Sequence, residues 1–196
     1  MDFDLSCNKF NILEKKQIIS NGRSALYLIL KQIKKKINIV YVPDYLCGSI
    51  LQPIKEIGLK YKFYKINKDF NFKLPCKKNS AVIFLNYFGI KNRKIENIKN
   101  NIKDNIFFIK DCTHDIFSKK NNFKDFNKKN IYQFASIKKY IPFPFGAITN
   151  NDNFKLNAQN KNDNEIFKKF FKTLNNINKY FSQTNGKIDF KIENKL

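Results

Sequence analysis

The sequence has little glycine and proline and no long apolar run. Six Gly and five Pro among 196 residues are too few for a disordered or fibrous chain. The longest clean apolar stretch, residues 25–30, is too short to cross a bilayer, and the acidic residues 1–4 are unlike a basic signal peptide. We therefore expect a folded protein in the cytoplasm, with no membrane span.

Closely spaced cysteine pairs are also absent. Cys7, Cys47, Cys76 and Cys112 are scattered, and no two of them have the spacing of a zinc knuckle or a redox motif. Without a secretory signal a disulfide framework is not expected, so we interpret all four as reduced thiols.

Acidic residues are few, 16 against 38 basic ones, which gives a net charge of +22. Such a charge is compatible with nucleic-acid binding, because basic proteins release counterions from phosphate backbones. However, only Arg23 and Arg93 are arginine, the residue that phosphate and base contacts favour. The lysines are spread along the chain with much Asn, Ile and Phe, the residues of A/T-rich codons. We therefore expect no nucleic-acid partner, and this alternative rests on charge alone.

Apolar and aromatic residues are abundant, at 42% and 15%, and supply a sizeable core. Their periodicity predicts helices over residues 22–36, 49–57 and 94–102, and strands over residues 39–42, 61–66, 81–85, 106–109, 132–135 and 147–149. The uninterrupted run 81–85 is typical of a strand buried on both faces. This order predicts an α/β fold: a mixed, mostly parallel sheet wrapped by helices, with functional groups at the C-terminal ends of the strands.

Beyond residue 150 the chain becomes rich in Asn and Lys. Apolar residues still recur there at helical spacing, at Ile166, Phe167, Phe170, Phe171, Leu174, Ile177 and Phe181. We expect a polar loop followed by one amphipathic helix. Its apolar stripe either covers the core of the same chain or meets a partner.

Three short segments carry candidate chemistry. Asn21-Gly22-Arg23-Ser24 opens the first predicted helix, and a helix start offers unsatisfied N–H groups to a phosphate. Asp111-Cys112-Thr113-His114 directly follows a buried-type strand. The third segment is Ser136-Ile137-Lys138-Lys139, and its last residue, Lys139, lies seven positions before Gly146. For the first segment taken alone, an ordinary helix start is the alternative.

In this order, the three segments resemble the DegT/StrS family of PLP (pyridoxal 5'-phosphate)-dependent sugar aminotransferases. The resemblance covers about residues 20–150. It implies that residues 1–150 form a PLP-binding large domain of the PLP-transferase fold type I. Residues 151–196 would hold the polar loop and the amphipathic helix, and the C-terminal small domain of the family would be absent.

The resemblance also implies roles for single residues. Lys139 would be the Schiff-base lysine, Asp111 would pair with the ring nitrogen of PLP, and His114 would contact its phenolic oxygen. The remaining cofactor contacts that it implies are Gly22, Arg23, Ser24, Asn86 and Ser136, together with Tyr45 and Cys47, which are discussed below.

Two alternatives remain for these roles. A lone histidine is often structural, and Lys138 competes with Lys139. If the segment is extended, only one of these two lysines reaches the cofactor.

Two further segments match the family more weakly. Residues 42–47 resemble the loop whose aromatic side chain stacks on the cofactor ring, but the stacking position holds Cys47, so either Tyr45 or Cys47 faces the ring. Residues 86–89, beginning with Asn86, resemble the turn that lines the pocket.

The activity implied by the resemblance is the transfer of an amino group from an amino acid, glutamate in our interpretation, to a nucleotide-linked keto-sugar. Such enzymes act in surface-polysaccharide or amino-sugar biosynthesis, and the resemblance implies a homodimer. The alternative is a truncated relative that serves as a binding module or as half of a split enzyme.

Overall fold

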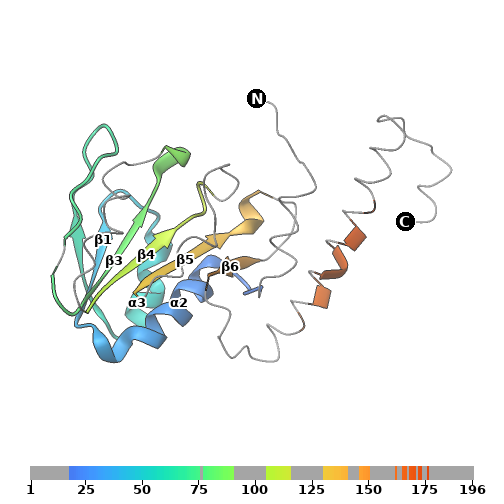
Figure 1. Ribbon diagram of the computed structural model, residues 1–196, viewed down its shortest axis with the longest axis horizontal. Helices are drawn as coiled ribbons and strands as arrows, with labels where there is room; N and C mark the ends of the chain where they lie inside the picture. Colours follow the sequence, from blue (N-terminus) through green and yellow to red (C-terminus); the bar gives the residue numbers. More distant parts are fainter. Residues whose placement is uncertain are drawn as a thin grey trace.

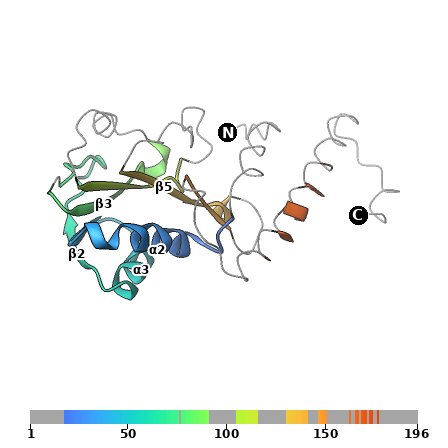
Figure 2. The same cartoon turned by 60° about the horizontal axis from the view of Figure 1, so that its bottom comes forward.

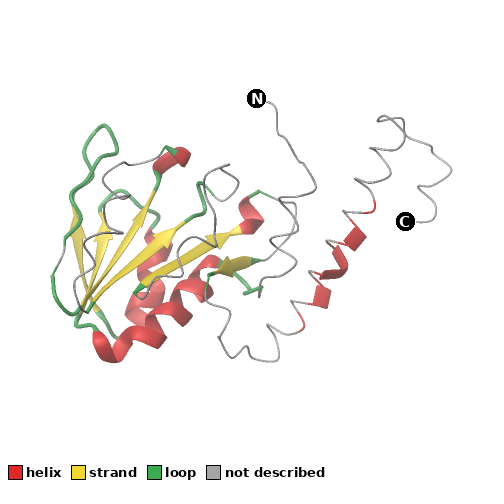
Figure 3. Ribbon diagram, viewed as in Figure 1, coloured by secondary structure: helices red, strands yellow, loops and turns green. Residues whose placement is uncertain are grey.

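The computed structural model describes residues 18–75, 77–90, 105–115, 130–140 and 146–150, and further residues 162, 165–166, 168–170, 172–173 and 176. Six strands form one sheet in the order β2-β1-β3-β4-β5-β6 (Figures 1 and 3). Their bounds are β1 Ile39–Pro43, β2 Lys60–Tyr64, β3 Ser80–Leu85, β4 Ile106–Asp111, β5 Ile131–Ser136 and β6 Ala147–Thr149. The six predicted strands are therefore confirmed.

Neighbouring strands from β1 to β5 are parallel, and only β6 runs antiparallel, beside β5. The predicted α/β class with a mixed, mostly parallel sheet is thus confirmed. All six residues of β3 are buried, as its uninterrupted apolar run indicated. Because β1, β3, β4 and β5 point the same way, the loops that follow them gather at one edge of the sheet.

Two helices cover one face of the sheet (Figure 2). The helix α2 spans Gly22–Ile33 and continues into the 3-10 turn η2, Lys34–Lys36. The 3-10 turn η3, Gly48–Ile50, leads into α3, Leu51–Glu56, after which Gly58 adopts a φ of +73°. A left-handed glycine is a common helix stop, which explains why the second predicted helix ends there.

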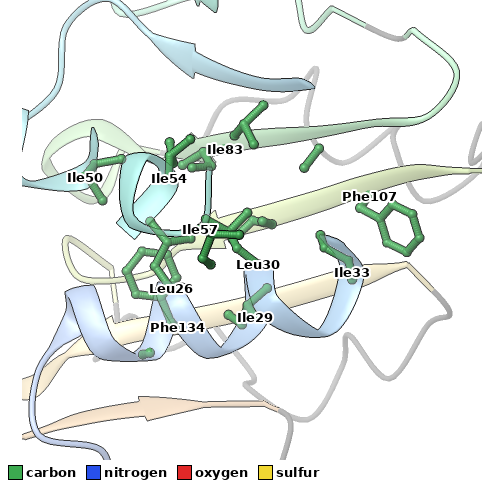
Figure 4. Packing of buried hydrophobic residues seen from close by; sticks show 14 of the residues in the cluster. Leu26, Ile29, Leu30, Ile33, Ile50, Ile54, Ile57, Ile83, Phe107 and Phe134 are labelled. Carbon is green, nitrogen blue, oxygen red and sulfur yellow. The ribbon is translucent and has the colours of Figure 1, made fainter. Parts of the chain in front are cut away.

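The core on the helical side joins α2 and α3 to the sheet (Figure 4). The helix α2 contributes Leu26, Ile29, Leu30 and Ile33, which are at most 1% exposed. Burying such a side chain contributes about 1.5–3 kcal/mol. This packing fixes the start of α2 relative to the strand ends.

A second apolar cluster lies on the opposite face of the sheet and includes Val82, Phe84 and Phe108. Alternation along β3 and β4 separates the two clusters up to the last residue of β3. The helical-side cluster holds Ala81, Ile83, Phe107 and Ile109, and the opposite one holds Val82, Phe84, Ile106 and Phe108, together with Leu85. The same alternation decides which polar side chains reach which face at the strand ends.

The segment before α2 is tied to β6. Ile19 and Ala147 exchange two backbone hydrogen bonds of 2.9 and 2.7 Å, and Gly146 N donates to Ser20 O at 2.8 Å. The start of α2 therefore lies beside the end of the segment that carries Lys139.

Several expectations fall wholly or partly outside the described residues. These include the helix over 94–102 and most of the apolar stripe after residue 150. The described residues between 162 and 176 are helical; among them Ile166 is 44% exposed and Thr173 donates to Lys169 O. No helix in the described part of the chain is long and apolar enough to cross a membrane.

Candidate functional site

A pocket of about 670 Å³ lies at the C-terminal edge of the parallel strands. Its walls come from the start of α2 and from the segments that follow β1, β3, β4 and β5. Among the predicted site residues, those that line it are Gly22, Arg23, Tyr45, Cys47, Asp111, His114, Ser136 and Lys139. The fold therefore brings together residues from four distant parts of the sequence.

One wall is the start of α2. The Asn21 side chain accepts the N–H of Ser24 at 3.0 Å and caps the helix. The N–H groups of Gly22 and Arg23 have no partner within the helix, and both residues line the pocket. A Cβ on Gly22 would lie 3.4 Å from the Cβ of Ser136, so glycine keeps this wall open beside a hydroxyl.

Asp111 ends β4 and lines the pocket from the helical side of the sheet. Its Oδ1 accepts the N–H of Thr113 at 2.9 Å. Burial raises the pKa of this carboxyl, while the hydrogen bonds with Thr113 and the charges of Lys139 and His114 lower it. The carboxyl is thus partly desolvated and surrounded by donors and cations, an arrangement suited to a cationic partner.

His114 is exposed at the pocket and is held by the loop after β3. Its Nδ1 accepts the backbone N–H of Phe88 at 3.2 Å, and the two rings stack with centroids 6.0 Å apart. Because a backbone N–H can only donate, Nδ1 is the acceptor, and the neutral imidazole carries its proton on Nε2. The geometry leaves Nε2 as the donor of this side chain.

Lys138 and Lys139 both line the pocket. The expectation that only one can do so assumed an extended segment, whereas residues Ile137–Lys139 form the 3-10 turn η6. The carbonyl of Gly146 accepts the N–H groups of Ile137 and Lys138 and holds this turn in place. Lys139 is the lysine whose charge lowers the pKa of both Asp111 and Cys47.

Tyr45 and Cys47 follow β1, and both line the pocket. The Tyr45 ring lies 5.8 Å from Phe70 and 5.6 Å from Tyr87, and it remains 57% exposed. The Cys47 thiol lies 3.2 Å from the Ser49 hydroxyl. Hydrogen bonds from Ser49 lower its pKa, burial opposes them, and Lys139 and Arg23 lower it further.

Two predicted cofactor contacts lie outside the pocket lining. The N–H of Ser24 is taken by the cap, and its side chain is not part of the pocket. Asn86 is 7% exposed, and its amide donates to Asp115 at 2.7 Å instead. Strand alternation explains this placement, because Asn86 continues the even-numbered positions Val82 and Phe84, which belong to the cluster on the opposite face.

Thr113 is a member of the site that the sequence analysis did not single out. Its hydroxyl accepts the N–H of Ser136 at 3.0 Å, and its carbonyl accepts the hydroxyl of Tyr140. Its position between Asp111 and His114, two candidate site residues, is the sequence feature that could have identified it. No group of three or more His, Cys, Asp or Glu side chains among the described residues could hold a metal ion.

No protein-family model matches the sequence, and no curated protein matches it. Comparison with solved structures shows that the fold is that of the fold type I PLP-dependent enzymes. One such structure is GDP-4-keto-6-deoxy-D-mannose-3-dehydratase from E. coli with bound hydrated PLP. It has a TM-score of 0.53 and 18% identity over 74% of this chain and 42% of that chain.

Two other structures with this fold are the sugar aminotransferase CalS13 from Micromonospora echinospora and L-threonine-O-3-phosphate decarboxylase from Porphyromonas gingivalis. CalS13 gives a TM-score of 0.51 at 11% identity over 72% of this chain and 44% of that one. The decarboxylase gives 0.53 at 14% identity over 74% and 49%. The chain thus spans less than half the length of these structures, and at such identities the likeness establishes the fold.

Proposed function

We propose that the chain is the cofactor-binding part of a PLP-dependent sugar aminotransferase of the DegT/StrS type. The reaction that we assign moves an amino group from an amino acid, glutamate in our proposal, to a keto-sugar on a nucleotide carrier. One observation carries the proposal: Asp111, Ser136 and Lys139 line one pocket together with the start of α2 and His114. Sugar-modifying enzymes among the structures with this fold support it.

The residues present fit PLP. The N–H groups at the start of α2 and the Ser136 hydroxyl suit a phosphate, and the absence of a Cβ at Gly22 leaves room beside them. The Asp111 carboxylate suits a protonated ring nitrogen. This cation would favour the ionised carboxylate, which burial alone disfavours. When bound, PLP supplies an electron sink for the substrate carbanion.

Lys139 is the lysine that we assign to the covalent bond with the cofactor. Its charge lowers the pKa of Asp111 at the end of β4 and of Cys47 after β1. The turn η6 presents its amine at the pocket, where a lysine amine can form a covalent bond with the aldehyde of a bound cofactor. We also assign to its Nζ the proton transfer at the amino donor.

Absorbance spectroscopy tests this assignment. Purified protein mixed with PLP should develop the visible band of a lysine-bound cofactor, and Lys139→Ala should abolish that band. Lys138→Ala is the matched control, because it removes the neighbouring amine of the same turn and should keep the band. A band that survives in Lys139→Ala, or none in the wild type, contradicts the proposal.

A second candidate is a module with this fold that acts only together with another polypeptide. It is supported by the length comparison, because this chain covers less than half of each solved structure described above. Full transaminase activity of the chain alone would reject it.

We further propose a homodimer in the PLP-loaded state, because a neighbouring subunit would complete the phosphate site. Light scattering that shows a monomer retaining PLP contradicts this.

A further inference from the structure

A buried ion pair lies on the face of the sheet opposite to α2. Lys110 Nζ and Asp115 Oδ2 are 2.8 Å apart, and their side chains are only 5% and 4% exposed. Lys110 belongs to β4, where it follows four buried apolar residues. A charged pair at this depth is tolerated only with close geometry and further hydrogen bonds, and its partners therefore have to be accounted for.

Asn86 provides a further hydrogen bond. Its Nδ2 donates to the same Oδ2 of Asp115 at 2.7 Å. Asn86 follows β3 and Asp115 closes the turn after β4, so this contact joins two neighbouring segments at the edge of the sheet. The fit between them is close, because a Cβ on Gly89 would lie 3.2 Å from the carbonyl oxygen of His114.

The two joined segments meet again at the pocket. Phe88, two residues after Asn86, donates its N–H to Nδ1 of His114, the residue before Asp115. Phe88 adopts a φ of +54°, a left-handed conformation that costs about 1–3 kcal/mol for a bulky residue and persists only where its surroundings enforce it. The buried contact on one face of the sheet and the histidine contact at the pocket therefore belong to one arrangement.

We propose that Asn86 and Asp115 are positioning residues that set the orientation and tautomer of His114. The buried contact between them holds the turn of residues 86–90 against the turn of residues 112–115. That position places the Phe88 N–H on Nδ1 and leaves Nε2 with its proton at the pocket. The use of His114 toward a cofactor rests on the proposed function, but the positioning itself exists without any cofactor.

The tautomer can be measured directly, because His114 is the single histidine of the sequence. Nitrogen-15 NMR of the cofactor-free protein gives one pair of ring signals that needs no assignment. At alkaline pH, where an imidazole is neutral, the wild type should show an unprotonated Nδ1 and a protonated Nε2. In Asn86→Leu, which keeps the Lys110–Asp115 pair, the two shifts should move toward each other as the tautomers mix.

Gln133→Leu is the matched control. Gln133 is a fully buried amide in register with Lys110, and its side chain has no hydrogen-bond partner among the described residues. Its replacement should leave the His114 signals unchanged. Should Asn86→Leu fail to fold, the double variant Lys110→Met/Asp115→Leu replaces the ion pair with apolar groups, a change that buried pairs often tolerate. That variant should mix the tautomers in the same way.

A wild type with the proton on Nδ1 overturns the proposal, and so does a folded Asn86→Leu or double variant with wild-type signals. These outcomes are independent of PLP. If the protein fails to bind PLP but shows the predicted tautomers, the proposed function fails and the positioning stands. If PLP binds and the tautomers do not change in the variants, the positioning fails alone.

Discussion

The hydroxyl of Thr113 accepts the backbone N–H of Ser136 at 3.0 Å. This bond joins the turn after β4 to the end of β5. It therefore connects the segment of Asp111, which we propose pairs with the ring nitrogen, to the segment of Lys139, the proposed Schiff-base lysine. Thr113 also donates its own N–H to Asp111, and its side chain makes a further hydrogen bond with the same carboxyl. One 3%-exposed side chain therefore fixes the spacing between the two groups that matter most for the proposed chemistry.

Thr113→Val should destabilise the protein by about 1–3 kcal/mol, because the buried N–H of Ser136 loses its acceptor and gains none. PLP binding should weaken as well, since Ser136 and Asp111 lose their common support. Thr113→Ser keeps the hydroxyl and serves as the control. Urea denaturation and PLP titration of both variants check this, and equal behaviour of Val and Ser would contradict the role of the hydroxyl.

Asp111→Asn should stabilise the cofactor-free protein at neutral pH. Burial raises the pKa of the folded carboxyl above its ordinary value of 3.8, against the hydrogen bonds of Thr113 and the nearby cations. As the pH rises from that value through the raised pKa, the unfolded state loses its proton first, so stability falls. The asparagine carries no such penalty and can still accept from Thr113.

Thermal unfolding of Asp111→Asn and wild type at neutral pH and below pH 3.8 measures this difference, which should vanish in acid. Asp44→Asn is the control, because Asp44 is paired with Lys65 at 3.4 Å and accepts the N–H of Ile66. It should show no stabilisation at neutral pH. An Asp111→Asn protein less stable than the wild type at neutral pH would refute the argument.

Gly22→Ala should separate phosphate binding from folding. The new Cβ would meet Ser136 and Phe134 only at 3.4 Å or more, so the stability should change by no more than about 0.5 kcal/mol. The methyl group would nevertheless narrow the space beside the helix start. We expect affinity for PLP to fall about tenfold, equivalent to about 1.4 kcal/mol.

Gly48→Ala is the matched control, since nothing lies within 4 Å of a Cβ at that position and the residue does not line the pocket. Calorimetric titration with PLP and with inorganic phosphate should distinguish the two variants. Unchanged affinity in Gly22→Ala would show that no phosphate lies against this residue.

Cys47 should react with iodoacetamide at a lower pH than an ordinary thiol. Hydrogen bonds from Ser49 are the main cause of its lowered pKa, and Lys139 and Arg23 add to them. In Ser49→Ala the pH profile of the reaction should therefore move toward higher pH. Cys47→Ser identifies the signal in a mass-spectrometric assay, and an unchanged profile in Ser49→Ala would remove Ser49 as the cause.

Most of the sheet could be predicted from the sequence because its strands carry strong local signals. Residues 81–85 of β3 are all apolar, and Pro43, Gly58 and Asp111 mark element ends by their backbone or polar character. The pocket as a gathering of Asp111, Ser136 and Lys139 could also be anticipated, since parallel strands collect their C-terminal ends at one edge.

The remaining details depended on geometry that a sequence does not contain. Lys138 and Lys139 share the pocket because Gly146, from another segment, accepts two N–H groups of a 3-10 turn. Asn86 turns away from the pocket because of strand parity and the buried carboxylate of Asp115. Lys110, a buried cation after four apolar residues of β4, was the available hint that such a carboxylate exists.

During synthesis, the segment that leads into α2 leaves the ribosome first, whereas its partner β6 leaves only after the sheet has been translated as far as β5. Contacts of such long sequence separation form late, because the chain between them must be ordered first. A nascent chain that stops just before Gly146 already contains Gly22, Asp111 and Lys139. It lacks, however, the strand that joins the start of α2 to the lysine turn, so the pocket becomes complete only with β6.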